Sequence, residues 1–283
     1  MTFKKTAIAF CAFYATIVSA QQIIPFRLTK TNNIIIKTLV NDKDSMNLMF
    51  QIAMEDASLS PERLRPAKSI IFKNEISENN SIKIGNMEWK NIRFYDNELT
   101  ANEADGKIGI GIFKGKSYQI DYDNNQFVIY DKLPDLAGYK EVSYTSNKEG
   151  QIFLACESKL EDFSFETNFL LQSGYSGGLL YSNDIADSRK LNQKLKITGE
   201  KVMKNSAGKS IITKQGILQE LVITDITMKE VSAGFFAGDI KTQKSSYFGA
   251  DMIKRFNWIF DAQTQMIYIK PSKYFNEPYF TMK

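Results

Sequence analysis

The chain has 283 residues, of which 43% are hydrophobic and 24% are charged, and its formal net charge is +4. This length allows one large all-β domain or two lobes of ordinary size, each with its own core. The absence of histidine from the sequence excludes Ser-His-Asp and Cys-His catalysis and every histidine-based metal site. The lysines and arginines form no run of five, so neither a nucleic-acid-binding face nor a polybasic membrane-binding segment is indicated.

Residues 1–20 have the pattern of a secretory signal peptide. Lys4 and Lys5 precede an apolar run over residues 7–17, and VSA at 18–20 provides a cleavage site. The apolar run is shorter than the ~20 residues that span a bilayer, which favours cleavage over an uncleaved anchor. We therefore expect an exported protein, periplasmic or secreted, that is not inserted in a membrane after cleavage. Removal of the two lysines with the leader lowers the net charge from +4 to +2.

Cleavage also removes Cys11 and leaves Cys156 as the remaining cysteine. An intramolecular disulfide is then impossible, so the stability of the protein must come from packing. Cys156 lies in the apolar run QIFLACES, which indicates a small buried side chain rather than a reactive thiol.

After the leader, short β-like runs alternate with turns rich in Asn, Asp, Gly and Lys. In chain order, the predicted strands lie at 33–40, 48–53, 69–73, 82–86, 92–96, 118–130, 151–158, 169–174, 216–225 and 266–271. The best helical candidates are short and lie at 188–194 and 251–256. The sequence therefore predicts a mainly β protein.

Three sequence blocks occur twice, in the same order. Ungapped comparison matches 48–59 with 169–180 at an offset of 121, 82–92 with 221–231 at 139, and 107–130 with 247–270 at 140. The first comparison pairs Gln51 with Gln172, Ala53 with Gly174 and Leu59 with Leu180. This pattern predicts two duplicated lobes, at 21–135 and 136–283, with an insertion of roughly 18 residues within 181–220 that a surface loop or flap could absorb.

The duplicated blocks resemble the two-lobed, retropepsin-like or pepsin-like aspartyl protease family over most of residues 30–272. In that family each lobe carries two apolar residues followed by D-T/S-G, and later a second apolar pair followed by glycine. The matching segments here are MFQIA (49–53) and KIG (107–109) in the first lobe, and LLQSG (170–174) and YFG (247–249) in the second. The apolar pair is incomplete in the first lobe, where Lys107 stands.

The resemblance implies a mainly β, two-lobed acid-protease fold, with one psi-loop β-barrel per lobe and few short helices. In that fold the strand that ends in the second glycine threads the loop to form the psi-shaped motif. The resemblance therefore assigns Gly109 and Gly249 a structural role in the two psi loops.

Both positions that match the catalytic aspartates are glutamine, Gln51 and Gln172. An aspartic protease needs two nearby carboxylates that share one proton, and a glutamine amide does not ionise near neutral pH. The sequence therefore predicts no catalytic residue at these positions. It predicts instead a binding site of Gln51, Ala53, Gln172, Ser173 and Gly174, with the two glutamine amides hydrogen-bonded to each other on the floor of a cleft.

Four other carboxylates are candidates to replace the dyad. Glu55 and Asp56 follow Gln51 and are expected near the cleft floor, although the second lobe has no matching acids. Asp121 and Asp261 occupy matched positions before hairpin turns, where each is expected to cap its own turn far from the other. No metal or cofactor site is indicated, because nothing completes a calcium loop around Asp123.

The sequence thus favours an exported pseudoprotease that binds an extended peptide or protein segment between its lobes, with flap-like hairpins near 66–83 and 203–216. Nucleic acid is not expected as a partner, and a monomer is expected because two lobes in one chain complete the cleft. Two alternatives stay open. The first is an active aspartic-type endopeptidase that uses Glu55 or Asp56, and the second is a β-rich scaffold without chemistry in its cleft.

Overall fold

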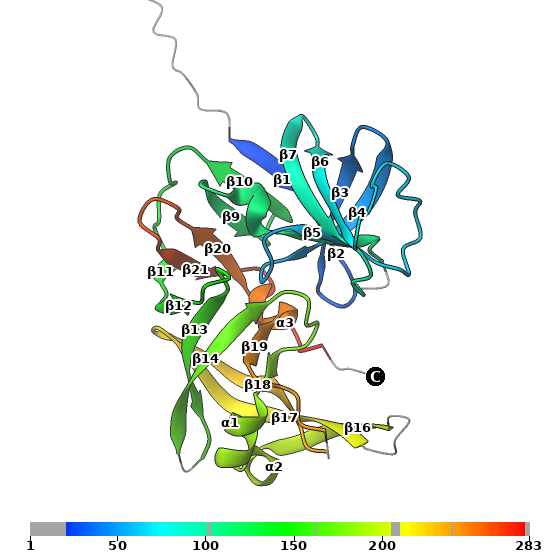
Figure 1. Ribbon diagram of the computed structural model, residues 1–283. Coiled ribbons are helices and arrows are strands. Elements are labelled where there is room, and N and C mark those ends of the chain that lie inside the picture. Colours follow the sequence, from blue (N-terminus) through cyan, green and yellow to red (C-terminus); the bar gives the residue numbers. More distant parts are fainter. Residues whose placement is uncertain (1–20, 101–102, 162, 205–209, 239, 281–283) are drawn as a thin grey trace, which may run out of the picture.

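The computed structural model describes residues 21–280 except 101–102, 162, 205–209 and 239. The predicted signal peptide lies outside the described residues. The described chain is mainly β, and its strands form three sheets (Figure 1). Its helical segments are one-turn or two-turn elements: η1 (Ile110–Phe113), α1 (Asn183–Ser188), α2 (Leu191–Lys194) and α3 (Ala250–Ile253).

The first lobe is a seven-stranded sheet that closes on itself. Its strand order is β2-β3-β4-β8-β5-β7-β6, and β3 also pairs with β6. The strands are β2 (Arg27–Leu28), β3 (Ile34–Val40), β4 (Asp44–Gln51), β5 (Ala57–Leu59), β6 (Ile76–Ile84), β7 (Met87–Tyr95) and β8 (Gly106–Gly109).

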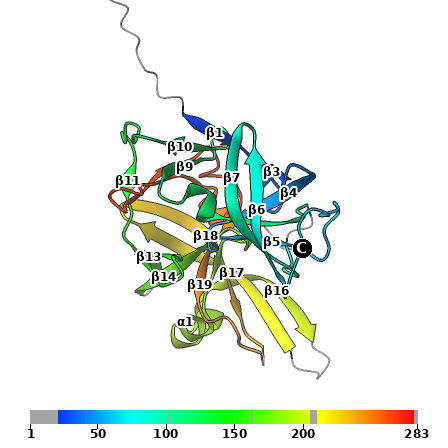
Figure 2. The same cartoon turned by 45° about the horizontal axis from the view of Figure 1, so that its top comes forward.

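The second lobe repeats this plan with one added strand. Its order is β12-β13-β14-β19-β15-β18-β17-β16, and β13 also pairs with β17. The strands are β12 (Tyr144–Ser146), β13 (Ile152–Lys159), β14 (Ser164–Gln172), β15 (Leu179–Leu180), β16 (Lys196–Lys204), β17 (Ser210–Ile223), β18 (Ile226–Phe236) and β19 (Ser246–Gly249). The added strand β16 forms one edge of the sheet, and Figure 2 shows β16 and β17 extending away from the centre of the molecule.

A six-stranded sheet joins the two lobes. Its order is β1-β10-β9-β20-β21-β11, and its strands are β1 (Gln22–Pro25), β9 (Ser117–Asp121), β10 (Gln126–Tyr130), β11 (Lys140–Glu141), β20 (Phe256–Phe260) and β21 (Ile267–Pro271). The order is palindromic, because each strand of the first half faces its counterpart in the second half across the sheet centre. The predicted lobe boundary at 135 lies between β10 and β11.

The register of this sheet places a pseudo-two-fold axis at its centre. In the antiparallel β9–β20 pair, Gln119 lies opposite Ile259, its own counterpart at the offset of 140. The neighbouring pairs, Ile120 with Trp258 and Tyr118 with Phe260, exchange under the same offset. Such a self-complementary contact is what two copies of one unit form around a two-fold axis.

One detail of the sequence comparison is wrong. Ala57 pairs with Ile108 in the first lobe, while Leu179 pairs with Phe248 in the second. Since Ile108 and Phe248 are counterparts, the offset has already changed from 121 to 122 at this strand. The second loop contains one more residue than the first, so Leu59 does not match Leu180 as the ungapped comparison suggested.

The region of the predicted insertion carries α1, α2 and β16, which have no counterpart between β5 and β6. A hairpin predicted near 203–216 is therefore present as β16–β17, with its tip outside the described residues. The strand predicted at 69–73 is wrong, since only a single bridge joins Lys73 to Ile76 there. Asn74 and Glu75 have positive φ values of 53° and 64° and turn the chain before a strand can extend, so no flap-like hairpin projects from this part of the first lobe.

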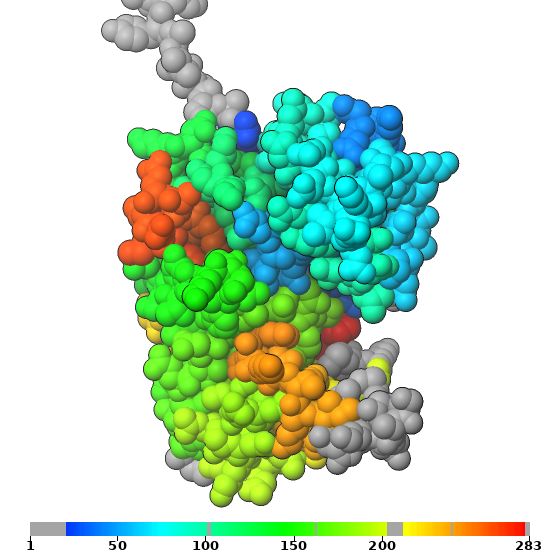
Figure 3. Space-filling view, viewed as in Figure 1, coloured from blue at the N-terminus to red at the C-terminus, as the bar shows by residue number. Residues whose placement is uncertain are grey.

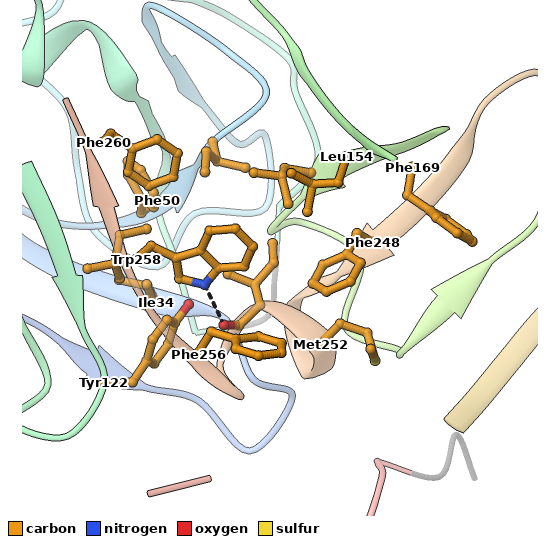
Figure 4. Packing of buried hydrophobic residues seen from close by; sticks show 14 of the residues in the cluster. Ile34, Phe50, Tyr122, Leu154, Phe169, Phe248, Met252, Phe256, Trp258 and Phe260 are labelled. Atoms are coloured by element: carbon orange, nitrogen blue, oxygen red, sulfur yellow. Dashed lines mark hydrogen bonds between the residues drawn. The ribbon is translucent and has the colours of Figure 1, made fainter. Parts of the chain in front are cut away.

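The two lobes share one continuous hydrophobic core. Trp258 is fully buried near its centre and donates a hydrogen bond from Nε1 to the carbonyl of Ile253 (Figure 4). Phe50 and Phe248, from the psi regions of the two lobes, pack into the same core. Cys156 is also buried, and burial raises the pKa of its thiol, which agrees with the prediction of an inert side chain.

Candidate functional site

Gln51 and Gln172 occupy equivalent places in the two lobes. Gln51 is the last residue of β4 and lies beside Gly109 in the parallel pair β4–β8. Gln172 is the last residue of β14 and lies beside Gly249 in the parallel pair β14–β19. The loop after each glutamine then turns back to pair with the far side of the same short strand, β8 or β19. This is the threaded loop that the family resemblance implied for both lobes.

Gly109 and Gly249 allow each loop to lie directly against its short strand. The amide of Gly109 donates to the carbonyl of Asp56, and that of Gly249 donates to the carbonyl of Gly178, each at 2.8 Å. A Cβ atom at Gly109 would lie 2.3 Å from the carbonyl oxygen of Met54, and one at Gly249 would lie 2.2 Å from that of Gly177. Only glycine fits such contacts with backbone atoms.

Ser173 links the two loops across the lobe interface. Its side chain is 4% exposed, and its Oγ accepts a hydrogen bond from the amide of Ile52 at 2.9 Å. The same Oγ lies 2.9 Å from the carbonyl of Phe50 and 3.1 Å from Oε1 of Gln51, either of which can accept its single proton. The first loop has Ile52 at the matching position, so this connection is made from the second lobe alone.

Two further amide side chains brace the lobes against each other. Asn33 donates from Nδ2 to the carbonyl of Ser173 at 2.9 Å, and Gln151 donates from Nε2 to the carbonyl of Ala53 at 3.2 Å. Asn33 directly precedes β3 and Gln151 directly precedes β13, so the two donors are counterparts in the two lobes, whereas their acceptors differ by one position in the loops. Sequence reasoning missed both residues, because the spacing along the chain does not show which loops meet.

Ser173→Ala should lower the free energy of unfolding by about 2 kcal/mol, because it leaves the buried amide of Ile52 without its partner. Ser173→Thr, which keeps the hydroxyl, should lose less. Urea unfolding followed by tryptophan fluorescence measures both variants, and Ser188→Ala at the exposed end of α1 is the control. Equal stability of Ser173→Ala and Ser188→Ala would contradict the assigned role.

The two glutamine side chains converge at Gly174. A Cβ atom at Gly174 would lie 2.5 Å from Nε2 of Gln51 and 3.3 Å from Oε1 of Gln172. Since both distances are measured from one point, the two side-chain amides lie close to each other. The predicted hydrogen bond between the glutamines is wrong: none of the bonds of these two described residues joins them. Each amide oxygen instead faces its own loop, where Ala53 donates to Gln51 at 3.5 Å and Gly174 donates to Gln172 at 3.3 Å.

The structure is similar to the crystal structure of aspartic proteinase from Irpex lacteus, with a TM-score of 0.58 and 10% sequence identity. The match covers 91% of this chain and 99% of that chain. The chain has the fold of a pepsin-like aspartic proteinase. No family model matches the sequence, and no curated protein matches it either. At this identity the likeness shows the pepsin-like fold alone.

The glutamines lie in a hollow of about 620 Å³ between the lobes of this pepsin-like fold. Figure 3 shows the blue-to-cyan part of the first lobe above the second lobe, which is green to orange on this face. Both lobes contribute to the lining of the hollow: Thr29, Thr31, Asn33, Met49, Gln51, Leu99, Thr100, Glu103 and Lys107 from the first, and Gln172, Gly174, Tyr175, Ser176 and Tyr247 from the second. Of the predicted binding residues, Gln51, Gln172 and Gly174 thus line this hollow, whereas Ser173 is buried beneath it and Ala53 is not part of its lining.

The charged side chains of the hollow already have partners. Glu103 pairs with Arg27 at 2.5 Å, and Lys107 pairs with Glu98 at 3.0 Å. Tyr175 carries a neutral hydroxyl, because burial, together with the charge of Asp251, raises its pKa to about 12. Among the described residues, the lining therefore carries no unpaired charge.

A second hollow of about 610 Å³ continues the first along the second lobe. The two share Tyr175 and Tyr247, whose ring centroids lie 6.3 Å apart. Beyond these rings the second hollow is lined by Leu180, Phe236 and residues of β16, among them Gly199 and Lys201. Sequence reasoning did not single out either tyrosine.

Glu55 and Asp56 do not lie where they were expected. Both line another hollow, together with Lys90, Arg93 and Lys114. Glu55 forms an ion pair with Lys114 at 2.7 Å, and Asp56 lies 3.7 Å from Arg93. The chain turns between Gln51 and these acids, which directs them away from the floor of the cleft and toward basic side chains.

Asp121 and Asp261 cap hairpin turns, as predicted. Asp121 accepts hydrogen bonds from Asn124 and Gln126, and Asp261 accepts from Gln263 and Thr264. Four residues of the β9–β20 ladder separate them, which is about 13 Å at the usual rise per residue.

The described residues contain no cluster of three or more acidic, cysteine or histidine side chains that could hold a metal ion. Within the same residues, no helix combines the length and apolar character that crossing a bilayer requires.

Proposed function

We propose that the protein is an exported, non-hydrolytic member of the pepsin-like fold that binds an extended peptide or protein segment between its lobes. The observation that carries the proposal is the placement of Gln51 and Gln172, side by side at the ends of β4 and β14, on the floor of the inter-lobe hollow. In this proposal they stand at the positions of a catalytic acid pair.

The chemistry of the amide explains why hydrolysis is not expected. An acid pair works because one carboxylate removes a proton from water while its protonated neighbour assists the carbonyl oxygen. Such acid–base assistance contributes roughly 10²–10⁴ in rate, and an amide supplies neither step. Glu103, the acid that lines the hollow, is paired with Arg27 and has no second carboxylate beside it in that lining.

The shape of the cleft supports an extended ligand. The two hollows meet at Tyr175 and Tyr247 and together form a groove that is longer than a single bound side chain would fill. The strand β16, whose residues line the far hollow, pairs with β17 only among the described strands, and a free strand edge can add a segment by main-chain hydrogen bonds. Export is supported by the signal-peptide pattern at 1–20, and a monomer by the presence of both lobes in one chain.

The test is selection of binders from a randomised peptide library on the immobilised mature protein. Peptides are expected to be enriched and to bind with dissociation constants in the micromolar range, typical of transient complexes. Leu99→Asp should weaken their binding about tenfold or more, because this 63% exposed side chain lines the hollow between the lobes.

The matched control is Leu64→Asp, which changes a 78% exposed leucine of the β5–β6 loop that is absent from both hollows. Neither leucine is in the core, so neither variant should unfold the protein. Failure to enrich any peptide, or equal weakening by Leu99→Asp and Leu64→Asp, would overturn the proposal.

A further inference from the structure

The orientation of the two glutamine amides indicates which chemical group the cleft floor can take. Backbone N–H groups can only donate, and those of Ala53 and Gly174 point at Oε1 of Gln51 and of Gln172. These two donors identify the oxygen of each amide, which is assigned from its hydrogen bonds because oxygen and nitrogen have nearly the same shape. The oxygens therefore face the loops that follow their own strands, and Nε2 of Gln51 lies against Gly174 of the other lobe's loop.

The two amino groups have no acceptor within the described protein. All the hydrogen bonds that Gln51 and Gln172 form through their side chains use Oε1. Nε2 of Gln51 lies where a side chain at residue 174 would stand, and glycine leaves that space open. The floor of the hollow thus offers two N–H₂ groups, one from each lobe, on either side of the pseudo-two-fold axis.

We infer that these two amino groups bind the two oxygens of one carboxylate carried by the bound segment. The inference rests on the proposed function and adds the group that the segment must present. A carboxylate is an acceptor with two oxygens, which matches one donor from each lobe, and hydrogen bonds to a charged acceptor are shorter and stronger than neutral ones. A peptide carbonyl can accept both bonds only at a single, uncharged oxygen, so it is the weaker acceptor for the pair.

The charge of the site is compatible with an anion. A pair of acids at positions 51 and 172 would repel a carboxylate, whereas two amides carry no charge. Glu103 is the acid that faces the same hollow, and its partner Arg27 offsets its charge. Lys107 is in the same lining, with its ammonium group held by Glu98. The free C-terminus of the segment and an Asp or Glu side chain within it are the two sources of such a carboxylate, and they share the same chemistry.

The experiment compares four pools of randomised, N-acetylated octapeptides for binding to the mature protein. Two pools have Gln fixed at a central position, with either a free C-terminal carboxylate or a C-terminal amide. The other two have Glu at that position, with the same two termini. If the site recognises the C-terminus, the pools with a free C-terminal carboxylate should bind at least tenfold more tightly than the amidated Gln pool. If it recognises a side chain, the pools with a central Glu should show the same gain. The pool that gains affinity identifies the source as terminus or side chain.

Gln172→Glu is the decisive variant, because it keeps the shape of the side chain and replaces the amino group by a charged acceptor. It should abolish the preference for carboxylate pools, and Gln51→Leu/Gln172→Leu should do the same by removing both donors. Thermal unfolding confirms that each variant is folded. Equal binding of the amidated Gln pool and the carboxylate pools would overturn this inference and leave the proposed function standing. Absence of binding by every pool would overturn both.

Discussion

Gly249→Ala is expected to lower the free energy of unfolding by about 3 kcal/mol, the upper part of the range for overpacking. The added methyl carbon would lie 2.2 Å from the carbonyl oxygen of Gly177 and 2.7 Å from that of Gly178. Both atoms belong to the backbone of the loop that follows Gln172, so a side-chain rotation cannot relieve the overlap. The backbone φ of Gly249 is −80°, which any residue adopts, so the effect comes from lack of space alone.

Gly199→Ala is the matched control, because a methyl group there meets no atom within 4 Å. Urea unfolding followed by tryptophan fluorescence measures both variants. Gly109→Ala should behave like Gly249→Ala, since its methyl carbon would lie 2.3 Å from the carbonyl oxygen of Met54. If Gly249→Ala were as stable as Gly199→Ala, the threaded loop of the second lobe would not be packed as described.

Arg255→Met should destabilise the protein by about 3–5 kcal/mol, the usual result of removing one partner from a buried ion pair. Arg255 is 1% exposed and lies beside Asp251, which is fully buried. Its Nη1 also donates to the carbonyls of Phe275 and Glu277, and the ring of Tyr279 lies 3.7 Å from its guanidinium carbon. Methionine fills similar space but leaves both carbonyls without this donor, and the Asp251 carboxylate keeps Lys254, at 3.3 Å, as its remaining cation.

Arg27→Met is the control for this variant. Arg27 forms an ion pair with Glu103 in which both side chains are about half exposed, and exposed pairs contribute little to stability. Limited proteolysis of the C-terminal segment gives a second readout, because Arg255 holds residues 274–277 against α3. A variant in which this segment is as resistant to protease as in the parent protein, with unchanged stability, would contradict the assigned role of Arg255.

The arrangement of the psi regions was predicted through the family resemblance that the repeated sequence blocks carry. Gln51 and Gly109, like Gln172 and Gly249, are adjacent in parallel strands, as that resemblance implied. The motif is visible in the local sequence because each glycine must lie against a loop backbone. The same pattern did not reveal the additional residue in the second loop, because a single insertion between small residues leaves the apolar sequence around it unchanged.

Contacts between distant segments were the part that sequence could not supply. The braces made by Asn33, Gln151 and Ser173 join residues about 100 or more positions apart, and nothing in their local sequence names the partner. The predicted strand at 69–73 failed for a related reason. Its apolar residues are divided between core and solvent, with Ile70 at 4% and Ile71 at 73% exposure, but a neighbouring strand to pair with is absent among the described residues.

The orientation of Glu55 and Asp56 was likewise decided by tertiary structure. Three or four residues of chain separate them from Gln51, which suggested a place on the cleft floor. The loop instead passes behind η1, where the carbonyl of Glu55 accepts from Gly111 and its side chain meets Lys114. Closeness in sequence to a site residue therefore did not mean closeness to the site.

The most direct test of the central claim is a search for cleaved products under conditions in which the cleft is occupied. The mature protein is incubated with a reduced and alkylated substrate protein from pH ~3 to ~8, where carboxylates with shifted pKa values would titrate, and the mixture is examined by mass spectrometry. We predict no fragments beyond those of the substrate alone, while peptides selected on the cleft still bind. Fragments that disappear in Glu55→Gln or Asp56→Asn would contradict the account and show that the fold retains catalysis through other acids.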